Sequence, residues 1–105
     1  MIKIRRLSDE IDYYDTYRVV LDEKIVMELK NGELKDYDAA DGKHTLKVVS
    51  DNYKSETLTF DTYKGEITEF ECKPNHGKSI VEKYARKLLL GKIGISLIKK
   101  NDFYL

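Results

Sequence analysis

Short runs in which apolar and polar residues alternate dominate the first two-thirds of the chain, and each run ends at a turn signal. Alternation with a period of two is the pattern of a strand buried on one face only. These runs occupy residues 2–5, 17–21, 25–29, 34–39, 44–49, 57–60 and 68–72. The rows expected to point inward include Tyr17, Val19 and Leu21, then Ile25, Met27 and Leu29, and finally Thr68, Phe70 and Cys72. Turns recurring about every ten residues between short strands are typical of a sandwich or barrel. We therefore predict a mainly β fold, an antiparallel β-sandwich of about seven strands.

The turn residues support this prediction. Asn31-Gly32 is the clearest signal, because both central positions of a type I′ turn need positive φ, which Asn and Gly tolerate best. Asp22-Glu23-Lys24 predicts a tight turn, and Asp41-Gly42 and Lys64-Gly65 predict further turns, the last of them in a hairpin. No helical pattern separates the strands, so βαβ units and a parallel sheet are not expected.

The pattern changes after Pro74. Ser79 and Glu82 have the spacing of a capping box, in which the two side chains satisfy each other's free backbone donors. Apolar residues then recur at helical spacing, at Ile80, Val81, Tyr84, Ala85, Leu88 and Leu89. We predict one C-terminal amphipathic helix that ends near Leu90, because Gly91 and Gly94 make its continuation costly.

Residues 91–105 leave two alternatives open. Ile93, Ile95 and Leu97 alternate and predict a closing strand. The competing interpretation is a longer helix, with only residues 103–105 extended. In either case we expect residues 1–75 to form the sandwich body and residues 76–105 a tail docked on the same domain.

Charge is divided unevenly along a chain whose net charge is zero. Residues 1–77 carry 12 basic and 17 acidic side chains, whereas residues 78–105 carry 7 basic and 2 acidic ones. This asymmetry indicates two parts with different surfaces. Because the β body is acidic and no strand face interleaves basic and aromatic residues, nucleic-acid binding is not expected.

The basic tail is the strongest functional lead in the sequence. Lys83, Arg86 and Lys87 lie opposite the apolar stripe of the predicted helix, and Lys92 follows it. Such a helix either docks on its own sandwich, which we favour, or contacts a protein partner or an anionic membrane surface, with residues 79–98 as the anchor. These four residues are therefore the candidate contact residues.

The location of the protein is predicted from what the sequence contains. The basic N-terminus has no apolar region behind it, and the apolar stretch from Leu88 to Ile98 is too short to span a bilayer. The single cysteine, Cys72, permits no disulfide within the chain. We expect a soluble cytoplasmic protein, or one peripheral to the membrane if the tail is an anchor.

Three sequence patterns that could indicate a chemical site each lack a required feature. Gly77-Lys78-Ser79 has the end of a phosphate-binding loop, but the position of its first glycine is Cys72. Cys72 and His76 offer two metal ligands where zinc needs three or four, and His44 lies in another strand. Cys72 falls on the inward phase of its strand, where a thiol is usually inert. We expect no enzyme activity, no metal and no cofactor.

An acidic cluster lies beside three tyrosines, Tyr13, Tyr14 and Tyr17. It consists of Asp9, Glu10, Asp12 and Asp15. It lacks the regular ligand spacing and central glycine of a calcium loop. We interpret it as a solvated loop, with a weak cation site or a partner contact as the alternative.

Residues 17–33 and 41–48 resemble bacterial PEGA-like domains, whose pattern is v-x-l-D-x-x-x-v, a Gly-Glu turn and G-x-H-x-l-x-v. The matching residues are Asp22, Gly32, Glu33, Gly42, His44, Leu46 and Val48. The stretches from Ser55 to Phe60 and at Gly65-Glu66 also fit, so the resemblance covers roughly residues 2–73. It implies an immunoglobulin- or transthyretin-like sandwich, usually non-enzymatic and often part of envelope-associated or multidomain proteins.

We therefore expect a non-catalytic interaction or structural domain of a bacterial protein, with an exposed strand edge or the C-terminal helix as its contact surface. The alternative is a peripheral membrane-associated protein anchored through the basic tail. A small metal-binding protein or enzyme using His44, Cys72 or His76 is the third hypothesis.

Overall fold

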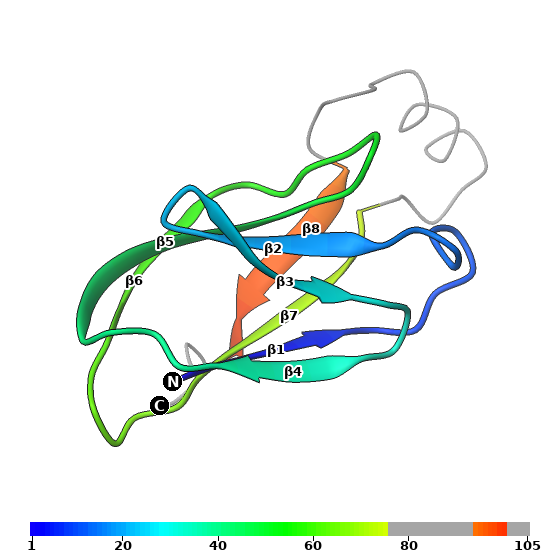
Figure 1. Ribbon diagram of the computed structural model, residues 1–105. Coiled ribbons are helices and arrows are strands. Elements are labelled where there is room, and N and C mark those ends of the chain that lie inside the picture. Colours follow the sequence, from blue (N-terminus) through cyan, green and yellow to red (C-terminus); the bar gives the residue numbers. More distant parts are fainter. Residues whose placement is uncertain (76–93, 101–105) are drawn as a thin grey trace.

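The alternating runs form strands in two four-stranded sheets. The structure is a computed structural model that describes residues 1–75 and 94–100. One sheet has the order β4-β1-β7-β8 and the other β3-β2-β5-β6 (Figure 1). The strands are β1 (Ile2–Arg6), β2 (Tyr17–Leu21), β3 (Lys24–Leu29), β4 (Leu34–Tyr37), β5 (Gly42–Val49), β6 (Leu58–Thr62), β7 (Thr68–Pro74) and β8 (Ile95–Lys99). The mainly β prediction is confirmed, with eight strands in these ranges instead of about seven.

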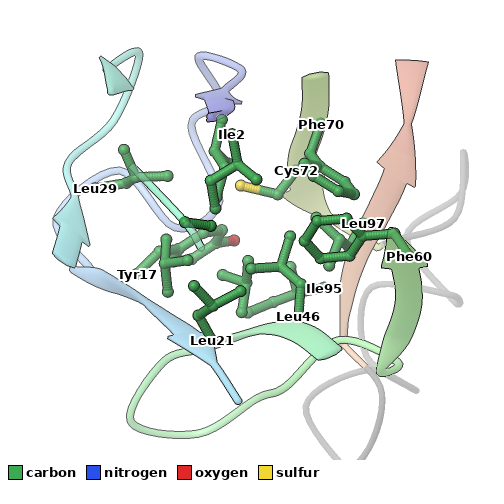
Figure 2. Packing of buried hydrophobic residues seen from close by; sticks show 14 of the residues in the cluster. Ile2, Tyr17, Leu21, Leu29, Leu46, Phe60, Phe70, Cys72, Ile95 and Leu97 are labelled. Atoms are coloured by element: carbon green, nitrogen blue, oxygen red, sulfur yellow. The ribbon is translucent and has the colours of Figure 1, made fainter. Parts of the chain in front are cut away.

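The two sheets share one apolar core. Figure 2 shows side chains from both sheets, among them Tyr17, Leu46 and Phe70, pointing toward the same interior. The inward rows predicted from the alternation are buried, namely Tyr17, Val19 and Leu21 on β2 and Thr68, Phe70 and Cys72 on β7. Period-two alternation predicts these faces because successive side chains on a strand point to opposite sides of the sheet.

Strand β3 departs from its predicted face. Ile25 was expected to point inward with Leu29, but it is 61% exposed whereas Leu29 is fully buried. The cause is a register shift opposite Val19 and Val20, where Val19 pairs with Met27 and Val20 with Ile25. One extra residue between these pairs reverses the orientation of the side chains beyond it.

The prediction of a purely antiparallel sandwich is wrong for one strand pair. β1 and β7 pair in parallel, from Ile2 opposite Thr68 to Arg6 opposite Cys72. The chain passes from one sheet to the other between β1 and β2, β3 and β4, β4 and β5, and β6 and β7. Strands brought together by such crossings are not obliged to run antiparallel, as the neighbours in a hairpin are.

The turns also differ from their predicted types. Positive φ at two successive residues occurs at Asp22 and Glu23, which join β2 to β3, and not at Asn31 and Gly32, where only Gly32 has it. The Asn31-Gly32 and Lys64-Gly65 turns each connect strands of different sheets, so the predicted hairpin at Lys64-Gly65 is wrong. Asp22 is held in this conformation because its N–H donates to the Thr45 carbonyl and its carboxylate accepts from the Thr45 N–H.

The open question about the end of the chain is settled for residues 95–99, which form the closing strand β8 and pair with β7. Ile95 and Leu97 are buried in the core, so this part of the segment proposed as a membrane anchor belongs to the sandwich. The predicted helix, with its capping box Ser79–Glu82, lies outside the described residues.

Candidate functional site

A buried arginine organises one end of the sandwich. Arg6 is the last residue of β1, and it continues the inward row of Ile2 and Ile4. Only 1% of its surface is exposed. Its backbone N–H donates to the carbonyl of Glu33, the residue before β4, which holds the end of β1 in place. The alternation of Ile2 and Ile4 extends to Arg6, but basic residues are so seldom buried that the pattern alone does not predict a buried arginine.

The guanidinium of Arg6 binds backbone carbonyls from two parts of the chain. Nη1 donates to the Asp15 carbonyl at 2.6 Å and to the Leu29 carbonyl at 2.8 Å, and Nη2 donates to the Asp12 carbonyl at 2.5 Å. The guanidinium carbon lies 3.8 Å from the centre of the Tyr17 ring. A planar group with five donors suits such a site, because it stacks on a ring while bonding several acceptors.

The loop of residues 7–16 is therefore only partly solvated, which corrects the prediction for part of the acidic cluster. Asp12 is buried, and its carboxylate accepts a hydrogen bond from the Tyr17 hydroxyl at 2.5 Å. Glu10 and Asp15 are exposed, as expected for a solvated loop. The base of the loop is thus held by polar contacts, and its outer residues face water.

A second polar cluster lies at the β2–β3 turn and contains two residues of the PEGA-like pattern. His44 Nδ1 lies 2.5 Å from an Asp22 carboxylate oxygen, and His44 Nε2 lies 2.6 Å from the Ala40 carbonyl. Both neighbours accept hydrogen bonds, so only the doubly protonated imidazolium donates to each of them. The ring is buried beside Phe60. His44 thereby joins the start of β5 to the β4–β5 connection and to the β2–β3 turn.

This geometry shifts two pKa values. The hydrogen bond to the Ala40 carbonyl and then that to Asp22 raise the pKa of His44, and Asp61 adds to the effect. The hydrogen bond from His44 and then that from the Thr45 N–H lower the pKa of Asp22. Each shift favours the charged form of its group, so the two groups stabilise each other as an ion pair.

We expect His44→Gln to destabilise the protein by about 1 kcal/mol near pH 6, since a charge-assisted but partly exposed pair is lost. Because the pKa of His44 is raised, its contribution is complete below about pH 6.5 and is lost as the pH rises through the folded-state pKa. Because the pKa of Asp22 is lowered, its contribution is lost as the pH falls through the folded-state value. Urea unfolding across this range measures both effects. Lys43→Gln, an exposed neighbour, is the control, and a difference that stays constant with pH contradicts the prediction.

Cys72 has little nucleophilic character. It is 1% exposed, and burial raises the pKa of its thiol to about 12. The thiolate is the reactive form, so the protonated thiol is a poor nucleophile near neutral pH. Both ring nitrogens of His44 are already bonded to Asp22 and Ala40. Within the described ranges, no group of three or more His, Cys, Asp and Glu side chains is placed to hold a metal ion.

The candidate contact residues Lys83, Arg86, Lys87 and Lys92 lie outside the described residues, as do His76 and the Gly77-Lys78-Ser79 segment. Among residues 1–75 and 94–100, no helix has the length and apolar character needed to cross a membrane.

Comparison of the chain with protein-family models, with curated proteins and with solved structures gave no match.

Proposed function

We propose that the chain is a non-catalytic interaction domain of a bacterial protein, and that it binds an extended segment of a partner protein along the edge of strand β6. A groove where β6 and β8 come together carries this proposal. It has a volume of about 440 Å³ and is lined by Leu58, Thr59, Phe60, Phe70, Leu97, Ile98 and Lys99. Figure 1 shows the two strands in their separate sheets.

The groove combines an apolar floor with a strand edge that no other strand of residues 1–75 and 94–100 covers. Phe60, Phe70 and Leu97 are buried in the core, whereas Leu58 is half-buried and Ile98 is 43% exposed. β6 pairs with β5 on one side, and no other described strand pairs with it. An unpaired edge offers backbone donors and acceptors to an incoming strand, and alternate side chains of that strand would contact the groove. A partner segment with alternating apolar residues fits this surface.

Selection from a phage-displayed library of random peptides on the immobilised full chain tests the proposal. We expect selected peptides to carry alternating apolar residues and to slow amide exchange along β6 when bound. Leu58→Lys places a charge at the mouth of the groove, so we expect it to weaken peptide binding about tenfold or more.

Ile25→Lys is the matched control, because Ile25 is exposed on β3, the other edge strand of the same sheet. Both variants must unfold cooperatively for the comparison to hold. Equal binding by the two variants, exchange protection away from β6, or failure to select any peptide would each overturn the proposal.

The proposal extends to the type of sandwich, the C-terminal helix and the location of the protein. We propose an immunoglobulin- or transthyretin-like, PEGA-like domain with a C-terminal helix docked on it, in the cytoplasm. The contact between Asp22 and His44, two positions of the pattern, supports the resemblance. Glu33 also supports it, because its carboxylate accepts from the Lys30 N–H and braces the Gly-Glu turn.

A further inference from the structure

The loop of residues 7–16, which joins β1 to β2, presents aromatic side chains to solvent. Tyr14 is 94% exposed, Tyr13 is 53% exposed, and Ile11 beside them is also exposed. The two tyrosine rings pack edge to face with their centroids 4.9 Å apart. Aromatic rings displayed in this way resemble the residues that dominate binding energy in protein interfaces, where tyrosine is enriched.

The loop that carries these rings is fixed at its base. Arg6 binds the carbonyls of Asp12 and Asp15, the residues on either side of the tyrosine pair. At the start of the loop, the Asp9 N–H donates to the Asn31 side chain, and the Asp9 carboxylate accepts from the Ile11 N–H. A loop fixed before binding loses less conformational entropy when it binds, which favours affinity.

The charge of the loop selects the chemistry of its partner. Residues 7–16 contain four acidic side chains and no basic one. Glu10, which precedes the tyrosine pair in the sequence, is exposed. Lysine and arginine side chains are attracted both to such a carboxylate and to the faces of tyrosine rings. We infer that the 7–16 loop is a docking surface for a basic segment of a partner protein, with Tyr14 as its central contact.

This surface is separate from the groove at β6 and β8, since the two share no residue. Binding at the loop and binding at the groove can therefore be tested independently of each other. Binding at the loop is expected to weaken as salt is added, because exposed charges attract one another less when screened. Binding of an apolar peptide along β6 is expected to depend much less on salt.

Site-specific photo-cross-linking in cells that produce the full chain tests this inference. The photoreactive residue benzoylphenylalanine replaces Tyr14 in one variant and Tyr63 in the control, since Tyr63 is a half-exposed tyrosine on the β6–β7 turn. We expect an adduct with a second protein at position 14 only, and mass spectrometry should place it in a segment rich in lysine and arginine.

The partner identified in this way is then purified and its binding to the intact chain is measured. Tyr14→Ala and Glu10→Lys are each expected to weaken binding about tenfold or more, whereas Tyr63→Ala and Glu56→Lys leave it unchanged. Absence of a specific adduct, an adduct with a second copy of this chain or with a lipid or nucleic acid, or binding independent of salt and of Glu10 would overturn the inference.

Discussion

Replacing Arg6 with methionine should lower the free energy of unfolding by about 3 kcal/mol, because three backbone carbonyls lose their donor in a buried site. Those carbonyls belong to Asp12, Asp15 and Leu29. Methionine fills a similar volume, so the change in the free energy of unfolding reports the lost hydrogen bonds more than lost packing. A small domain has a total stability of roughly 5–15 kcal/mol, so this single change is large. Urea unfolding followed by circular dichroism gives the number.

Arg5 provides the matched control. It is the preceding residue on β1 and is exposed, so Arg5→Met removes the same charge and should change stability by less than about 0.5 kcal/mol. Arg6→Lys should recover less than half of the loss, since a compact ammonium cannot reach three separate carbonyls and stack on Tyr17. Equal effects of Arg5→Met and Arg6→Met would show that the buried contacts contribute nothing.

Arg6→Met should also affect the proposed docking surface, the 7–16 loop. Without its guanidinium donors, the carbonyls of Asp12 and Asp15 are no longer held, so amide exchange in residues 12–15 should accelerate in Arg6→Met. Partner binding at Tyr14 should weaken in the same variant even though no exposed residue has changed. This follows because the loop would then have to be ordered at the moment of binding.

The faces of the strands could be predicted from the sequence where the pairing is regular. Alternation identified the inward rows of β2 and β7, because the orientation of a side chain depends only on its position along a regular strand. It failed at Ile25, because the register shift opposite Val19 and Val20 depends on the partner strand. The sequence of β3 by itself contains no signal for it.

The order of the strands could not be predicted from the turns. Asn31-Gly32 and Lys64-Gly65 were identified correctly as turns, and Gly32 and Gly65 both have positive φ. A turn residue reports that the chain reverses locally and says nothing of which sheet the next strand joins. The parallel pairing of β1 with β7 joins segments more than sixty residues apart, so only the packing of the whole core determines it.

The polar contacts of both clusters illustrate the same limit. The inward position of Arg6 follows from the alternation of β1, but its acceptors lie on a loop and on β3, and no local pattern connects them. Asp22 was identified as a turn residue, His44 as a candidate ligand or catalytic residue, and both as matches to a family pattern, but no signal in the sequence paired them. Their contact joins a turn to a strand 22 residues away.

The role of Gly94 in the structure differs from the one that the sequence indicated. This glycine was interpreted as a residue that discourages a helix, but it immediately precedes β8 and lies against Tyr53. A Cβ atom at Gly94 would lie 2.4 Å from Cδ1 and 2.8 Å from Cγ of the Tyr53 ring. The backbone there is also tied down, since the Gly94 N–H donates to the Lys54 carbonyl and its carbonyl accepts from the Asn75 N–H.

Because neither the buried ring nor the bonded backbone can withdraw freely, we expect Gly94→Ala to destabilise the protein by about 2 kcal/mol. A double-mutant cycle with Tyr53→Ala isolates the cause. Once the ring is removed, the added methyl group has room, and Gly94→Ala should be close to neutral in that background. Urea unfolding of the four proteins measures the coupling. If the two losses simply add, the contact between the ring and Gly94 is not what requires glycine at this position.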